Sequence, residues 1–357
     1  MKRNLHMIYT FMTVAMLCAC NGHVDGQTAD AYPLESLSVK VGNSWYHASI
    51  DQEEHTAVIG SLKNGDSITD VRYTLQTDDA TISPDPQEFI GNWSETQEVT
   101  VNVGGIKTVY SIFFPDWDEN ASELLFSDEF DTDGIPDRNK WVLCPVGTSD
   151  WCNQMSESYD QAYVKDGNLV LVAEKKEGKY LAGGIKTQDK FAFEFGRVEC
   201  RARITRHPDG AFPAIWMMPQ KSLYEGWPDC GEIDIMEHIR QEPVIHQTIH
   251  TYYRNTLGHE ENTTRTTECN YWDYNVYSVE WTDEYLAFYV NGALTFRYDN
   301  MYLQDEAQMK QWPFGVGSEF YLILNMGLGD PGTWAGPIDD AGLPAIMEVD
   351  WIRVYNK

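Results

Sequence analysis

Three carboxylates stand close together in the segment GEIDIMEH, residues 231–238. Glu232, Asp234 and Glu237 lie within six residues of a stretch that is otherwise apolar. Two carboxyl groups on either side of a glycosidic bond can hydrolyse it, one as an ionised nucleophile and the other as a proton donor. Neighbouring negative charge helps, because it raises the pKa of the carboxyl that must keep its proton. A solvated acidic edge and a site for a hard cation are the alternative interpretations of this spacing.

The alternation of isoleucines with acids predicts that this segment is a strand rather than a helix. Glu232 and Asp234 would share one face of the strand, and the isoleucines would share the other. Glu237 is at an odd offset from Glu232 and would point into the core of a regular strand. One extra residue near Ile235–Met236, with Met236 as the inserted residue, would form a β-bulge. Such a bulge returns Glu237 to the face of the other two acids.

The rest of the chain must supply the sheets that position this strand. From residue 124 to the end, strand patterns follow one another, and only DEAQMKQW (305–312) has a helical pattern. This order predicts two stacked antiparallel sheets in one domain of residues 124–357. A second series of short alternating strands predicts a small Ig-like β-sandwich over residues 34–115, followed by a linker at 116–123. We expect the small sandwich to act as a spacer or accessory domain.

The first residues predict export. Lys2 and Arg3 precede an apolar run, residues 7–17, that is too short to span a bilayer. The segment closes with LCAC, which resembles the lipobox of bacterial lipoproteins and implies cleavage before Cys20 and lipid attachment to its thiol. An ordinary secretory signal is the alternative. We therefore expect residues 1–19 to be a signal peptide, residues 20–33 a flexible tether, and the protein to be anchored by lipid to the bacterial outer membrane.

Charge and cysteine content narrow the choice of partners. The formal net charge of −29 disfavours nucleic acid and sulfated or uronic polysaccharides, so we expect a neutral partner.

Five of the seven cysteines follow Cys20, an odd number whose spacing matches no zinc motif. Cys144 and Cys152 are near enough in sequence to form a disulfide, but nothing in the sequence requires one. We expect a monomer.

The acidic segment resembles the signature E-x-D-x-x-E of glycoside hydrolase family 16, which lies on a bulged strand of a β-jelly roll. Other segments follow in the family's order: FAFEFGRVECRARI, GAFPAIWMMP, IHQTIHTYY, YSVEWTDEYLAFYVNG and MEVDWIRVY. The resemblance covers residues 124–355, and the six-residue spacing is similar to the laminarinase-like branch. It implies an all-β, concanavalin-like β-jelly-roll sandwich, here preceded by an Ig-like or BACON-like domain. Glu232 would be the nucleophile, Glu237 the acid/base, and Asp234 the residue that tunes the nucleophile.

Aromatic side chains are expected near these acids, because the apolar C–H faces of sugar rings stack on them. Trp216 and Trp227 match sugar-platform positions of the family, with a place in the core as the alternative for each. His250 matches the family histidine beside the acid/base, where it could hydrogen-bond the sugar or Glu237, so we expect it to bind substrate. The period of two places His246, Thr248 and His250 on one face of a strand. A zinc site is not indicated, because no third ligand has a recognisable spacing.

The resemblance also implies a structural calcium ion, while catalysis would need no cofactor. Its ligands would be Glu129, the Gly167 carbonyl and Asp350, which supply the hard oxygen atoms that calcium prefers.

Two segments depart from the family pattern where substrate subsites would form. AGGIKTQ (182–188) has glycine where many relatives have a polar or basic residue. The segment at residues 246–268 is longer and more polar than a typical laminarinase loop. We expect a retaining endo-β-glycosidase acting on a neutral β-linked polysaccharide or oligosaccharide, either laminarin-type β-1,3-glucan or mixed β-1,3/1,4-glucan. An endo-β-1,4-galactosidase acting on keratan-like or mucin-type glycans is the first alternative. A non-catalytic glycan-binding lipoprotein is the second.

Overall fold

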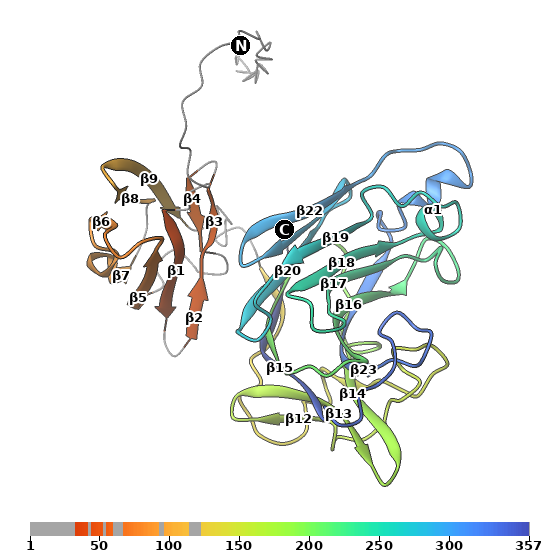
Figure 1. Ribbon diagram of the computed structural model, residues 1–357. Coiled ribbons are helices and arrows are strands. Elements are labelled where there is room, and N and C mark those ends of the chain that lie inside the picture. Colours follow the sequence, from red (N-terminus) through yellow and green to blue (C-terminus); the bar gives the residue numbers. More distant parts are fainter. Residues whose placement is uncertain are drawn as a thin grey trace, which may run out of the picture. The chain divides into compact units, whose positions relative to one another are not determined.

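The computed structural model describes residues 33–41, 44–52, 55–59, 67–92, 96–113 and 123–356. The expected signal peptide, Cys20 and nearly all of the expected tether and linker lie outside these residues. The described chain is almost entirely β-strand (Figure 1). Among these residues no helix has the length and apolar character needed to cross a membrane.

The first nine strands form two sheets around a core of their own. One sheet has the order β2-β1-β5-β7 and the other β3-β4-β9-β8-β6. Leu37, Val71, Tyr110 and Ile112 from the two sheets are buried together in this core. The elements are β1 (Leu34–Val41), β2 (Ser44–His47), β3 (Ser49–Asp51), β4 (Thr56–Val58), β5 (Ser67–Leu75), β6 (Thr81–Ser83), the 3-10 helix η1 (Pro86–Phe89), β7 (Gly91–Asn92), β8 (Gln97–Val103) and β9 (Ile106–Phe113).

The remaining strands form one continuous antiparallel sheet that folds into two layers, so the predicted jelly-roll sandwich is confirmed (Figure 1). The first layer contains β19 (Thr264–Glu268), β18 (Val244–His250), β17 (Glu232–Glu237), β16 (Ala211–Lys221), β23 (Glu319–Leu328) and β14 (Lys179–Lys186), in that order. The second layer continues with β13 (Asn168–Lys176), β24 (Ala345–Tyr355), β15 (Gly196–Arg206), β20 (Asn275–Trp281), β21 (Tyr285–Val290) and β22 (Ala293–Asp299). The short strands β10 (Leu124–Asp128), β11 (Val142–Leu143) and β12 (Ala162–Lys165) pair with β24, β14 and β13.

Strand β14 joins the two layers, because its first half pairs with β13 and its second half with β23. Gly183 and Gly184 stand where the pairing changes. A Cβ atom at Gly183 would lie 1.8 Å from the backbone oxygen of Gln161, and one at Gly184 would lie 3.1 Å from Cys144 Sγ. Glycine is therefore favoured at these two positions of AGGIKTQ, because neighbouring segments pack too closely against the strand to leave room for a side chain.

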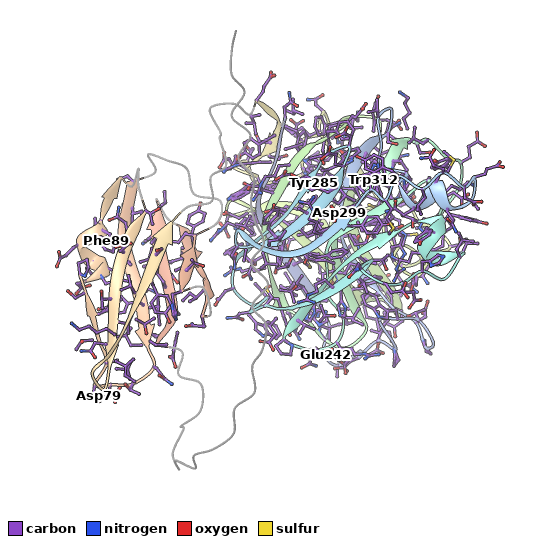
Figure 2. The ribbon with its side chains drawn as sticks, turned by 90° about the horizontal axis from the view of Figure 1, so that it is seen from above. Asp79, Phe89, Glu242, Tyr285, Asp299 and Trp312 are labelled. Atoms are coloured by element: carbon purple, nitrogen blue, oxygen red, sulfur yellow. The ribbon has the colours of Figure 1, made fainter. Side chains whose placement is uncertain are left out.

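Aromatic side chains fill the space between the layers. Trp281 of β20 is fully buried, meets Phe320 of β23 edge-on at 5.2 Å, and donates from Nε1 to the Phe314 oxygen at 2.8 Å. Trp312, labelled in Figure 2, meets Phe314 edge-on at 5.4 Å. These contacts tie the two layers together and give the first layer a rigid support. The five cysteines after Cys20 are all free in the structure.

The predicted helix at residues 305–312 is wrong for most of its length. Only a 3-10 turn, η2 (Gln308–Gln311), forms there. Asp305 Oδ1 accepts from the backbone N–H groups of Ala307 and Gln308 and so caps the start of this turn. Pro313 follows and disfavours helical geometry at Trp312. The structure instead has a short helix, α1 (Tyr252–Asn255), directly after β18.

Candidate active site

Strand β17 contains the bulge that the sequence predicts. In its pairing with β16, Met236 lies opposite Ile215 and Asp234 lies opposite Trp216, which leaves Ile235 without a partner. The pairing with β18 shifts at the same place. The inserted residue is therefore Ile235 rather than the predicted Met236, because the register with β16 resumes at Met236.

The bulge turns all three acids away from the core. Ile233, Ile235 and Met236 are fully buried in the apolar core. On the other face Asp234 is 1 % exposed, while Glu232 and Glu237 are half-buried. The neighbouring strand β18 places three residues opposite the acids, as the period of two predicts: His250 faces Glu232, Thr248 faces Asp234 and His246 faces Glu237.

The spacing along β17 leaves room for a sugar between two carboxyl groups. Successive residues on one face of a strand are roughly 6.6 Å apart, so the backbones of Glu232 and Glu237 stand roughly 13 Å apart with Asp234 between them. The two glutamate side chains are longer than that of Asp234 and can lean toward each other above it. A retaining glycosidase needs its two carboxyl groups about 5–5.5 Å apart, a separation that such leaning can reach.

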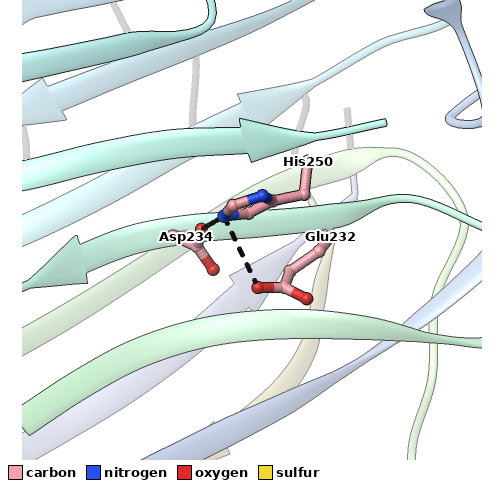
Figure 3. A group of neighbouring side chains, drawn as sticks. All are labelled: Glu232, Asp234 and His250. Atoms are coloured by element: carbon pink, nitrogen blue, oxygen red, sulfur yellow. Dashed lines mark ion pairs between the residues drawn. The ribbon is translucent and has the colours of Figure 1, made fainter. Parts of the chain in front are cut away.

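His250 and Trp227 hold Asp234 and Glu232 in place. His250 Nε2 lies 3.3 Å from Asp234 Oδ2 and 3.9 Å from Glu232 Oε1 (Figure 3). Trp227 donates from Nε1 to Glu232 Oε2 at 2.8 Å. The contact of His250 with Glu232 and the Trp227 hydrogen bond favour a negative charge on Glu232. His250 thus lies opposite the expected nucleophile, whereas the resemblance places it beside the acid/base Glu237.

The electrostatic environment separates the two glutamates. Burial, followed by the charges of Asp234 and Glu232, raises the pKa of Glu237 well above its usual value, and Arg254 opposes this only in part. Burial and Asp234 also raise the pKa of Glu232, but His250 and the Trp227 hydrogen bond oppose the rise. Glu232 is thus the carboxyl with specific partners for its ionised form. Glu237 is the one that keeps a proton.

The two predicted sugar platforms differ in exposure. Trp227 precedes β17, is 55 % exposed, and its ring centre lies 5.8 Å from that of His250, so its open surface adjoins Glu232. Trp216 lies on the acid-bearing face of the sheet but is only 6 % exposed. Trp216 donates from Nε1 to Asn325 Oδ1 at 2.7 Å and is met edge-on by Trp151 at 4.8 Å. Trp216 therefore fits the alternative interpretation, a buried residue beneath the site.

Several residues near the acids were not found from the sequence. Asp150 raises the pKa of Glu237 through its charge, and Trp151 packs on Trp216, yet their loop has no recognisable spacing. Asn325 did leave a signal in the sequence, because it is the one amide in the apolar segment FYLILNM. In the structure its side chain is fully buried. A buried amide requires hydrogen-bond partners. Arg254 and Asn255 of α1 contact His250 from the long polar segment, and the sequence marked only the segment.

His246 remains without a proposed role. Its ring meets Trp334 edge-on at 5.0 Å, and burial lowers its pKa, so it is neutral near pH 7. Within the described part of the chain, Glu232, Asp234 and His250 are the one group of three side chains close enough to share a metal ion. His250 does not fit that role, because two donors meet its Nδ1 atom. A neutral ring that accepts at Nδ1 carries its proton on Nε2, the atom nearest the carboxylates, and so has no lone pair there for a metal.

The predicted calcium ligands are engaged by arginines. Arg353 donates to both carboxylate oxygens of Glu129 at 2.9 and 2.8 Å, and Asp350 accepts from Arg201. Gly167 lies in the turn between β12 and β13 with φ +76°. A guanidinium on each carboxylate repels a divalent cation, so these residues, as they are placed, do not fit a calcium ion.

Comparison with known proteins identifies the family. A model described as glycosyl hydrolases family 16 matches residues 149–352, more than half of the chain. The chain belongs to this family. A second model, described as a domain of unknown function (DUF4971), matches residues 1–130.

Relatives of this family 16 chain include proteins named as galactosidases and as glucanases. A keratan-sulfate endo-1,4-beta-galactosidase of Sphingobacterium multivorum is 39 % identical over 66 % of this chain and 55 % of its own length, so the chain spans about half of that relative. A beta-glucanase of Rhodothermus marinus is also 39 % identical, over 66 % of this chain and 85 % of its own length. One solved structure is described with the words that prominent members of the human gut microbiota express endo-acting O-glycanases to initiate mucin breakdown. Its sequence is 36 % identical to that of this chain, and the TM-score is 0.59. That match covers 65 % of this chain and 98 % of the solved one.

Proposed function

We propose that this protein hydrolyses internal linkages of a β-linked glycan with retention of configuration. The observation that carries the proposal is the bulged strand β17, which turns Glu232 and Glu237 to one face and gives them different partners. The Trp227 hydrogen bond and the neighbouring His250 favour the ionised form of Glu232, and Glu237 lies among negative charges that favour its protonated form. Retaining glycosidases require this division between a nucleophile and an acid.

In the first step, a carboxylate oxygen of Glu232 attacks the anomeric carbon as the glycosidic bond breaks. Glu237 donates its proton to the departing oxygen, so the leaving sugar departs as a neutral alcohol. In the second step, Glu237 removes a proton from water, and the water oxygen displaces Glu232 from the anomeric carbon. The first step leaves Glu232 esterified and Glu237 ionised, and the second step returns both to their starting states, with His250 beside the nucleophile.

The first candidate substrate is a β-1,3-glucan or a mixed β-1,3/1,4-glucan, supported by the beta-glucanase relative and the six-residue spacing of the acids. A galactose and N-acetylglucosamine glycan of keratan or mucin type is the second candidate. It is supported by the galactosidase relative and by the solved structure described with mucin O-glycanases. The net charge of −29 favours neutral chains in both groups.

Digestion of a glycan panel tests the proposal. The panel contains laminarin, barley-type β-glucan, keratan sulfate and mucin O-glycans, and the products are separated by chromatography. We expect internal cleavage of at least one glycan, which is lost on Glu232→Gln and on Glu237→Gln. The matched control is Glu268→Gln, an exposed acid on β19, which should keep full activity. Binding without cleavage of any glycan would support the non-catalytic alternative, and full activity of both active-site variants would refute the assigned pair.

We also infer that the protein is exported and lipid-anchored through Cys20, as a monomer. The support is the basic and apolar start of the chain and the LCAC sequence. In bacterial cells, wild-type protein should partition with the outer membrane, and Cys20→Ala should be recovered in soluble fractions. Light scattering of the detergent-free chain without residues 1–20 should give the mass of one chain. Equal membrane association of the Cys20→Ala variant would refute the anchor.

A further inference from the structure

Helix α1 lies in the long polar segment that departs from the family pattern, and it contacts the active site through His250. The helix begins after Thr251, whose Oγ1 accepts from the backbone N–H of Arg254 at 3.1 Å. Thr251 is fully buried, so the start of the helix is fixed next to His250. Two side chains of α1 then meet the imidazole: Arg254 Nη1 and Asn255 Nδ2 each lie 3.0 Å from His250 Nδ1.

Both of these groups must donate. A guanidinium has only N–H donors. The orientation of the Asn255 amide follows from its other contact, because its Oδ1 accepts the backbone N–H of Thr251 at 3.2 Å. The opposite end of that amide is therefore its NH2 group, which faces His250. An imidazole nitrogen that meets two donors must itself be an acceptor.

The Arg254 guanidinium is held on its other side as well. Its Nε donates to Thr263 Oγ1 at 3.0 Å, and Thr263 donates its own hydroxyl proton to the Glu260 oxygen at 2.7 Å. Thr263 is 1 % exposed, so this arrangement is shielded from water. Two parts of the polar segment after β18 are therefore joined by hydrogen bonds, and these bonds fix the Arg254 guanidinium that meets His250.

We propose that Arg254 and Asn255 are positioning residues that fix the tautomer of His250, with its proton on Nε2. Against the effect of burial, Asp234 raises the pKa of His250, but the two donors at Nδ1 require that atom to accept and so to carry no proton. The ring proton therefore lies on Nε2, which is 3.3 Å from Asp234 Oδ2 and 3.9 Å from Glu232 Oε1. The other tautomer would turn a lone pair toward the two carboxylates. The polar segment thereby directs the N–H of His250, rather than a lone pair, toward Asp234 and the nucleophile.

The kinetic consequence rests on the proposed function, whereas the tautomer can be measured without any substrate. Nitrogen NMR of protein with ¹⁵N-labelled histidine distinguishes the two ring nitrogens, and the His250 signals are identified by their loss in His250→Gln. In the wild-type chain we expect a protonated Nε2 and an unprotonated Nδ1 at neutral pH. A protonated Nδ1 with a bare Nε2 would overturn the proposal, even if no glycan were cleaved.

Variants test the cause of the tautomer. In Arg254→Ala/Asn255→Ala we expect a mixture of tautomers and a fall in kcat of about tenfold, with KM changed less than kcat, because a lost hydrogen bond to a polar partner has this size. Arg254→Lys keeps a donor and should recover most of the Nε2–H tautomer and of kcat. Arg265→Ala, on the exposed strand β19 of the same segment, is the control and should change neither. If the double variant does not fold, the single variants Arg254→Ala and Asn255→Ala serve in its place, with the same expected direction. An unchanged tautomer and kcat in the folded alanine variants of Arg254 and Asn255 would refute the proposal.

Discussion

Trp227 offers a test of how Glu232 stays ionised. The indole donates to Glu232 Oε2 at 2.8 Å, while its ring surface is 55 % exposed. Trp227→Phe removes the donor and keeps an aromatic face for stacking on sugar. The variant therefore separates the electrostatic role of this side chain from its role as a platform.

The expected shift follows from the strength of that bond. A hydrogen bond to a charged group contributes about 1.5–3 kcal/mol, and the exposed position of Trp227 places it at or below the lower end. A loss of about 1.4 kcal/mol raises the pKa of Glu232 by about one unit. Since the nucleophile must be ionised, activity is lost as pH falls below this pKa. The acidic limb of the kcat/KM profile should therefore move up by about one pH unit.

The assay is the pH dependence of kcat/KM on the glycan that the panel identifies. Trp272→Phe is the matched control, because Trp272 is also exposed and packs on Tyr271, away from the acids. The control should leave the acidic limb in place. If Trp227→Phe lowers kcat/KM equally at every pH, then the indole acts through its ring alone, and the account of Glu232 ionisation is wrong.

Three further outcomes follow from the structure. Burial lowers the pKa of His207 to about 4 and that of His238 to about 3. As the pH falls from 8 to 5, the unfolded chain therefore gains these protons and the folded chain does not, so the free energy of unfolding decreases. Urea unfolding should show that this decrease is about 2 kcal/mol smaller in His238→Gln than in wild type. Asp234→Asn removes a charge that raises the pKa of Glu237, so the basic limb of kcat/KM should move to lower pH. Because arginines engage Glu129 and Asp350, a chelator should leave the melting temperature unchanged; a fall on chelation would restore the calcium interpretation.

Much of the first layer follows from the alternation of residue types. Glu232 and Asp234 had to share a face, and the odd offset of Glu237 required an inserted residue. Which residue is inserted did not follow, because Ile235 and Met236 are both apolar and both fit the core. The register with β16 decides it, and that register depends on a partner distant in the sequence.

Other parts of the site depend on contacts that leave little local signal. Trp216 matched a platform position, but its burial results from Trp151, which a separate loop places against it. The helix α1 is only four residues long, too short for a periodic pattern, and its start is fixed by a single threonine cap. The expected helix at residues 305–312 had the right pattern, but only one turn forms, and Pro313 disfavours helical geometry at Trp312.

The central claim is that Glu232 forms a covalent bond to the sugar. A 2-deoxy-2-fluoro glycosyl fluoride of the cleaved sugar reacts with loss of fluoride and leaves a slowly hydrolysed ester on the nucleophile, which peptide mass spectrometry can locate. We expect one sugar per chain, on Glu232, and no label in Glu232→Gln. A label on Asp234 or Glu237 of the wild-type protein would contradict it.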